Sequence, residues 1–142
     1  MENSVELKKI ANELAMQLVN KGYIVHRYNS YSTESVYLKV DYGLGKSIRI
    51  SNHEGKGHLR YTYNIRGDIS KSYSEYDNGV TRNYIPFSEW ESVLGRVDSH
   101  VKNLKEVYSE GWYNRELKKY ERMGKSSLGK GFWQGAFKVK KK

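Results

Sequence analysis

The feature that most constrains the fold is a sustained alternation of apolar and polar residues from Val36 to Ile65. Apolar side chains recur at every second position in three segments, which is the period of a β-strand. Two glycine-rich stretches, 43–46 and 53–58, interrupt the alternation and predict tight turns. We therefore expect three consecutive strands, with one face covered by the rest of the chain and the other face in water.

The alternation assigns apolar residues and cations to opposite faces of these strands. The expected core face consists of Val36, Leu38, Val40, Ile48, Ile50, Leu59, Tyr61, Tyr63 and Ile65. The other face carries Lys39, Arg49, Arg60 and Arg66, with Asp41 as its acid. Arginine binds phosphate through a planar fork, so we expect at least two of these side chains to face a ligand. The alternative is an ordinary solvated surface.

Helices are expected on both sides of this β region. Residues 3–21 have apolar side chains at helical spacing, and Asn3 begins a capping box. A second amphipathic segment begins at Ser88, which also starts a capping box, and a short basic helix is expected over 112–123. The apolar positions 90, 94, 97, 101, 104 and 108 form a near-heptad seam. This seam predicts either ordinary core packing or contact with a partner helix.

Two further segments complete the fold prediction. Residues 23–28 are β-branched and aromatic, and residues 69–85 contain Asn78-Gly79, a strong signal for a two-residue hairpin turn. The chain is thus expected to be one α+β domain over residues 1–142. It should contain an N-terminal helix, an antiparallel sheet of four to six strands with an Asn-Gly hairpin, two C-terminal helices within 88–124 that support oligomerisation, and a basic tail over 125–142.

The positive charge is concentrated near the C-terminus. The formal net charge is +9, and residues 112–142 hold ten basic and two acidic groups. Such a block indicates an anionic partner, the alternative being a solubilising tail. The chain has no cysteine, which excludes disulfides and thiolate metal sites. Its first residues do not resemble a signal peptide and no apolar run is long enough to span a bilayer, so we expect a soluble, intracellular protein.

Known catalytic and cofactor motifs do not fit this chain. Residues 124–130 match the first seven positions of a phosphate-binding P-loop, but Gly131 stands where Ser or Thr is required, and the expected strand and helix around it are absent. A weaker anion-binding loop that uses Ser126 and Lys130 remains an expectation. His53, Glu54 and His58 share one turn without a zinc-site spacing. We therefore expect no enzyme activity, no metal and no cofactor.

The stretch from Tyr37 to Lys56 resembles a motif of small proteins encoded by phages and prophages of Gram-positive bacteria, over residues 37–66. The layout of the whole chain resembles that of the first-described Thoeris anti-defence family. This resemblance implies a phage protein in the host cytoplasm that sequesters cyclic ADP-ribose isomers without degrading them. It also implies a homo-oligomer, a dimer or a hexamer, with ligand pockets between protomers.

The residues themselves suggest how such a ligand is held, because phosphates need arginine forks and a base needs an aromatic slot. We expect cations from the sheet, from a neighbouring subunit's C-terminal helix and from the tail. The expected phosphate ligands are Arg27, Arg49, Arg60, Arg66, Arg115, Arg122, Ser126 and Lys130, with Tyr63 and Trp112 as stacking rings. The alternative function is a phage-encoded inhibitor that binds nucleic acid or a host nuclease through the same basic surface.

Overall fold

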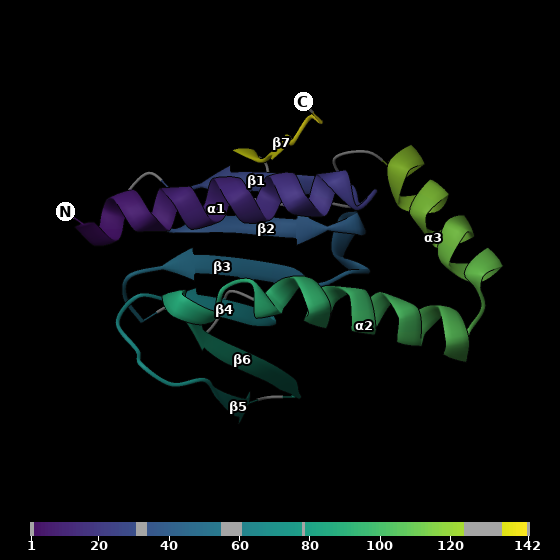
Figure 1. Cartoon of the computed structure of the whole chain (residues 1–142). Coiled ribbons are helices and arrows are strands. Elements are labelled where there is room, and N and C mark those ends of the chain that lie inside the picture. The colour runs from purple at the N-terminus through teal and green to yellow at the C-terminus, as the bar shows by residue number, and fades with distance from the viewer. Residues whose placement is uncertain (1, 31–33, 55–60, 78, 124–134, 142) are drawn as a thin grey trace.

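The computed structural model describes residues 2–30, 34–54, 61–77, 79–123 and 135–141, and shows an α+β fold built on one mixed sheet (Figure 1). Its sheet has seven strands in the order β5-β6-β4-β3-β2-β1-β7. The helices are α1 (Glu2–Asn20), α2 (Ser92–Val107) and α3 (Glu110–Met123), with short 3-10 turns η1 (Asp41–Gly43) and η2 (Phe87–Glu89). The strands are β1 (Val25–Asn29), β2 (Val36–Val40), β3 (Ser47–Ser51), β4 (Tyr63–Arg66), β5 (Tyr73–Asp77), β6 (Val80–Pro86) and β7 (Phe137–Lys138).

The expectation of an antiparallel sheet is wrong at its centre. β2 pairs antiparallel with β1 and β3, as the alternation predicts. β4, however, runs parallel to β3, with Ile48 opposite Tyr63, and parallel to β6 as well. Parallel neighbours cannot be joined by a tight hairpin, so the expected turn between β3 and β4 is replaced by a crossover, of which residues 55–60 lie outside the described residues. The sheet also has more strands than the four to six expected.

The two edges of the sheet come from segments whose pairing was harder to predict. β5 pairs antiparallel with β6, with Asp77 opposite Val80. Asn78 lies outside the described residues, so the two-residue turn remains a prediction. At the other edge the basic tail returns to the sheet, where β7 pairs antiparallel with β1 and Val139 N–H donates to Val25 O at 2.8 Å.

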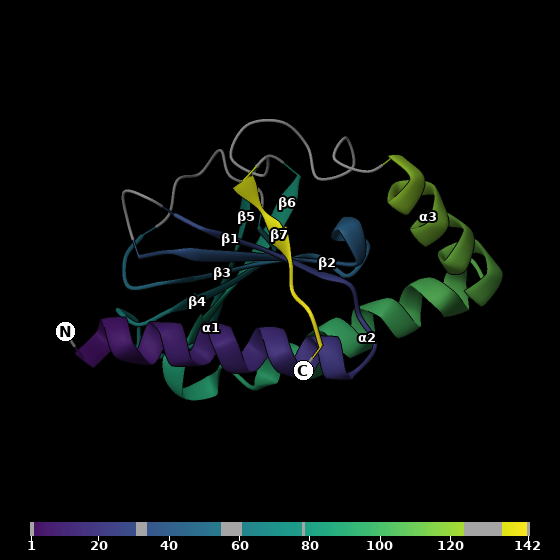
Figure 2. The same ribbon diagram turned by 90° about the horizontal axis from the view of Figure 1, so that it is seen from above.

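Helices α1 and α2 cover the same face of the sheet, as the view from above shows (Figure 2). The apolar stripe of α1 and the alternating apolar positions of the strands meet there, which buries both. The main core includes Leu7, Leu14, Leu18, Leu38, Val40, Ile48, Ile50, Tyr63, Ile65, Ile85, Val97 and Val101.

Most residues of the near-heptad seam pack into this core. Leu94, Val97 and Val101 are buried in it, while Tyr108 beyond the end of α2 is 59% exposed. Neither expected capping box opens its helix. Ser88 lies in η2 and α2 has Glu91 at its N-cap without a side-chain bond. α1 starts at Glu2, so Asn3 falls inside its first turn.

A buried hydrogen bond fastens α3 to the end of the sheet. Tyr113 Oη donates to Asp41 Oδ2 at 2.5 Å, while Asp41 Oδ1 accepts from Ile24 N–H at 2.8 Å. Burial raises the pKa of Asp41, and burial together with the Asp41 bond raises the pKa of Tyr113. Asp41 and Tyr42 also have left-handed φ angles of 49° and 56°. The chain accepts this strained turn where it places the carboxylate against α3.

In the described part of the chain, none of the helices has the length and apolar character that crossing a membrane requires.

Candidate functional site

The face of the sheet opposite α1 and α2 is polar, and yet it is buried. We call it the arginine–tyrosine face, defined by Arg49, Arg66, Arg82, Tyr37, Tyr61, Asn64 and Tyr84. Each of these seven residues is at most 9% exposed. The expectation that this face is solvated is therefore wrong, and three cationic side chains have been taken out of water. Burying a charge is costly unless a partner compensates it.

Arg49, at the centre of β3, is 1% exposed and is held by neutral groups. Its Nη1 donates to the His53 backbone oxygen at 3.0 Å and to Asn64 Oδ1 at 3.4 Å, and its Nη2 donates to Ser35 Oγ at 3.3 Å. No carboxylate among the described residues contacts the Arg49 guanidinium. Arg49 Nε and the neighbouring Asn64 Nδ2 are buried and make no hydrogen bond with the described residues. Two donors thus lack an acceptor at one place.

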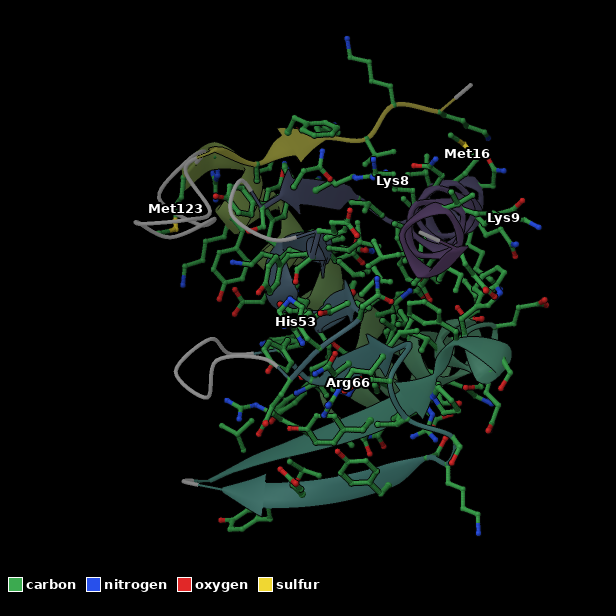
Figure 3. The ribbon with its side chains drawn as sticks, turned by 90° about the vertical axis from the view of Figure 1, so that its left-hand side faces the viewer. Lys8, Lys9, Met16, His53, Arg66 and Met123 are labelled. Carbon is green, nitrogen blue, oxygen red and sulfur yellow. The ribbon has the colours of Figure 1, made fainter. Side chains whose placement is uncertain are left out.

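Among the described residues, two acids lie by this face: Glu75 is opposite Arg82 and accepts from Tyr84 Oη at 3.3 Å, and Asp68 pairs with Arg66 of β4. Arg66 Nε and Nη2 donate to the two oxygens of Asp68 at 2.8 and 2.5 Å. This bidentate bond raises the pKa of Arg66 and lowers the pKa of Asp68. Arg66 Nη1 also donates to Tyr73 Oη at 3.2 Å, and the guanidinium lies 5.6 Å from the centre of the Tyr84 ring. Figure 3 shows Arg66 and His53 on the side of the sheet away from α1.

The guanidinium groups of Arg49 and Arg82 both lie over the ring of Tyr61. Its ring centre is 5.7 Å from the Arg49 guanidinium and 5.0 Å from that of Arg82. An aromatic face between two cations spreads their charge and offers a planar surface. Tyr37 packs against Tyr61 with the ring centres 6.4 Å apart. Guanidinium groups and phenol rings are therefore interleaved across β2, β3, β4 and β6.

The same face remains electropositive toward β1. Burial and the nearby Lys138 and Lys39 lower the pKa of His26. Burial also lowers the pKa of Lys39. Both groups therefore hold a proton less readily than in water, chiefly because burial disfavours their charged forms, and at His26 the two lysines add to this effect.

Arg49 and Arg66 are the expected site residues that the structure brings together. Arg27 and Tyr63 are not part of this group. The register places Arg27 opposite Leu38, on the helix-covered side, where it bonds Asn12 of α1. Tyr63 is 6% exposed and packs in the main core, away from the arginines of this face. The pleat of the sheet separates both from Arg49, because neighbouring positions point to opposite faces.

Arg115 and Arg122 lie together on α3 instead. With Lys118 and Glu121 they line a cavity of about 540 Å³. Trp112 stacks on Tyr108, with ring centres 4.4 Å apart, and packs against the core. Arg60, Ser126 and Lys130 lie outside the described residues.

Sequence reasoning missed Arg82, Tyr84 and Tyr61. For Arg82 and Tyr84 the signal was present, since Ile85 is apolar and residues at even positions of β6 must then point the other way. Tyr61 was assigned to the core face because the alternation was extended through it. The structure places Tyr61 before the start of β4, where the backbone is not a strand and the alternation does not apply.

Comparison with protein-family models, with curated proteins and with solved structures found no match to this chain. The site must therefore be judged on its own chemistry. Within the described ranges, no three histidine or carboxylate side chains are grouped so that they could hold a metal ion. The arginine–tyrosine face instead offers donors, cations and rings, which suit an anion with a planar part.

Proposed function

We propose that this protein binds a cyclic nucleotide signal, of the cyclic ADP-ribose class, and sequesters it unchanged as a phage anti-defence protein. The observation that carries the proposal is the buried Arg49 guanidinium, which no carboxylate of the described residues contacts, and whose Nε, like the neighbouring Asn64 Nδ2, finds no acceptor among those residues. Phosphate oxygens supply both the missing charge and the missing acceptors. The resemblance of the chain's layout to the Thoeris anti-defence family suggests this class of phosphate ligand.

The rings give the proposal its second element. Tyr61 and Tyr84 lie against the three guanidinium groups, and a nucleobase can stack where a tyrosine ring and an arginine plane meet. Since Arg49 is 1% exposed, the groups that cover it must move to admit the ligand. Sequestration needs tight binding and abundance only, without transition-state stabilisation.

A titration followed by recovery of the ligand tests this function. Purified protein is titrated with cyclic ADP-ribose isomers by calorimetry, then denatured by heat, and the released nucleotide is analysed by chromatography. We expect saturable binding and unchanged nucleotide. Arg49→Met should abolish the binding, whereas the exposed Arg96→Met should not. Converted nucleotide would contradict sequestration, and the absence of any heat of binding would contradict the ligand class.

The cavity on α3 favours a second candidate, an inhibitor that binds nucleic acid or a nuclease. Arg115, Lys118 and Arg122 gather there with one acid, Glu121, in the manner of a surface that follows a phosphate backbone. Its signature would be duplex binding that weakens steeply with salt and is lost in Arg115→Gln with Arg122→Gln but kept in Arg49→Met. The reverse pattern supports the nucleotide site.

We further propose that the protein works as a homo-oligomer. Tyr76 on the edge strand β5 is 76% exposed, and Val107 and Tyr108 at the turn between α2 and α3 are 64% and 59% exposed. Large apolar side chains left in water are natural subunit contacts. Light scattering at micromolar concentration should give a mass above that of one chain.

A further inference from the structure

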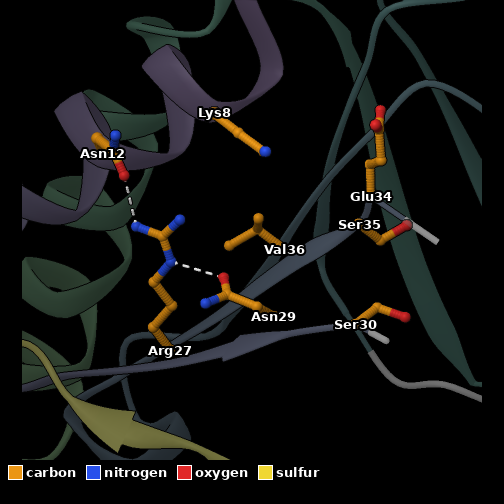
Figure 4. Close-up of a pocket in the computed structure, with 8 residues that line it drawn as sticks. All are labelled: Lys8, Asn12, Arg27, Asn29, Ser30, Glu34, Ser35 and Val36. Atoms are coloured by element: carbon orange, nitrogen blue, oxygen red, sulfur yellow. Dashed lines mark hydrogen bonds between the residues drawn. The ribbon is translucent and has the colours of Figure 1, made fainter. Parts of the chain in front are cut away.

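We propose that the protein has a second anion-binding site, for a small phosphate monoester, in the cavity where α1 passes over β1. The cavity measures about 400 Å³, and Lys8 and Arg27 line it (Figure 4). Arg27 points to the helix-covered side of the sheet, so this cavity is separate from the arginine–tyrosine face. The inference therefore goes beyond the proposed nucleotide site and does not depend on it.

Arg27 is fixed in place by neutral acceptors. Its Nη1 donates to Asn12 Oδ1 at 2.7 Å and its Nε donates to Asn29 Oδ1 at 2.9 Å. Two hydrogen bonds from different nitrogens define the plane of the guanidinium, which removes most of its freedom before any ligand arrives. No described residue accepts a hydrogen bond from Nη2. The remaining edge of the fork is thus oriented and available.

The charge of Arg27 lacks compensation. Burial lowers the pKa of Arg27, and no carboxylate among the described residues bonds its guanidinium. The amide oxygens of Asn12 and Asn29 orient the group without neutralising it. A positively charged, preoriented fork is the arrangement that recognises a phosphate or a carboxylate in bidentate fashion.

Lys8 supplies a second cation from another element. Figure 4 shows Lys8 and Arg27 reaching the same cavity from α1 and from β1. Glu34 is the carboxylate among the described lining residues, and it is exposed. Two cations against one solvated acid favour a dianion over a singly charged carboxylate, because each cation can then meet its own oxygen. A phosphate monoester carries close to two charges at neutral pH.

A second cavity, next to the first, can hold the organic group of the phosphate monoester. It measures about 570 Å³, shares Arg27 and Asn12 with the first cavity, and has Glu13, Met16 and Val139 in its lining. Arg27 therefore stands between a charged compartment and one that is partly apolar. A phosphate held by Arg27 and Lys8 can extend its organic group along α1 toward Met16. The fit is thus to a phosphate monoester with a small apolar body.

NMR titration of the full-length protein with phenyl phosphate and with inorganic phosphate tests the site. Saturable shifts are expected for the side-chain amides of Asn12 and Asn29, with phenyl phosphate binding more tightly than inorganic phosphate. Lys8→Gln should weaken binding by about tenfold or more, the usual effect of losing one charge-assisted hydrogen bond. Arg27→Gln should abolish it.

The chain offers a matched control in Lys9. Lys8 and Lys9 are adjacent on α1, but Lys9 leaves the helix on another side, pointing away from the sheet (Figure 3). Lys9→Gln removes the same charge from the same helix and should change binding little. An equal loss in Lys8→Gln and Lys9→Gln would overturn the site, since the effect would then be general electrostatics.

Two further outcomes decide the remaining questions. Phenyl phosphate that binds no better than inorganic phosphate would overturn the role of the second cavity. Lost phenyl phosphate binding in Arg49→Met would overturn the separation of the two sites, while retained binding there supports it even if that variant shows no nucleotide binding. Because Lys8 is exposed, Lys8→Gln should fold normally, so the test does not depend on Arg27→Gln being stable.

Discussion

The two faces of the sheet are buried to a similar degree by opposite chemistry. On the helix-covered face, Ile48, Ile50 and Ile65 are fully buried among the apolar side chains of α1 and α2. On the arginine–tyrosine face, Arg49 and Asn64 are equally inaccessible, but Arg49 Nε and Asn64 Nδ2 find no acceptor among the described residues. The apolar side chains of the first face are covered by α1 and α2. The second would gain charge and acceptors from the anionic ligand proposed above.

The two faces contribute differently to the stability of the fold. Apolar burial stabilises the fold by roughly 25 cal/mol per Å² of apolar surface, and the helix-covered face provides most of it. A buried guanidinium gives no such benefit unless its charge is compensated. The proposed ligand would supply that compensation to Arg49.

The largest effect is expected on the helix-covered face. Ile50→Ala should lower the free energy of unfolding by about 2–5 kcal/mol, because Ile50 packs between Val36 and Ile65 and leaves a cavity when it is truncated. Urea unfolding measures this loss. A loss below about 1 kcal/mol would mean that this face is loosely packed, and the contrast between the faces would fail.

On the arginine–tyrosine face, truncation should act on binding and hardly on stability. Arg49→Met keeps the length of the side chain and removes an uncompensated charge, which offsets the loss of its hydrogen bonds. We expect the free energy of unfolding to change by about 1 kcal/mol or less, with Arg96→Met as the surface control. A loss as large as that of Ile50→Ala would show that the guanidinium is a structural element of the fold.

Much of the first face could be predicted from the sequence. The period of two between Val36 and Ile50 fixes which side chains meet the helices, and the stripe of α1 at helical spacing finds its partner. The second face could not be predicted in the same way, because alternation says which residues point away from the core and nothing about what covers them. The parallel pairing of β3 with β4 was also hidden, since strand direction depends on the path of residues 52–62.

For the candidate site, the sequence predicted the residue types but not their grouping. It predicted arginines together with tyrosines, and it placed Arg49 and Arg66 on the same face of the sheet, as the strand register does. The grouping of the remaining cations was not predicted, because it depends on tertiary position. Arg27 lies across the sheet and Arg115 lies on α3, where they contribute to two other cavities.

The smallest expected effect is on the pKa values of two histidines, one from each side of the sheet. His26 lies on the same side of the sheet as the arginine–tyrosine face, and burial followed by Lys138 and Lys39 lowers its pKa. His100 of α2 lies on the helix side, where its Nε2 is 3.1 Å from Leu44 O, and burial followed by Lys46 lowers its pKa. Lys39→Met should raise the pKa of His26 and leave that of His100 unchanged, as followed by NMR titration.

The complementary change gives the control and the sign of the pH dependence. Lys46→Met should raise the pKa of His100 and leave that of His26 unchanged. A histidine whose pKa is lowered on folding takes up a proton more readily when unfolded, so its contribution to stability is lost as pH falls through the ordinary histidine pKa toward the folded value. Lys39→Met should therefore reduce the destabilisation at acidic pH. If either substitution shifts both histidines equally, the potential is spread over the molecule and the arginine–tyrosine face has no positive field of its own.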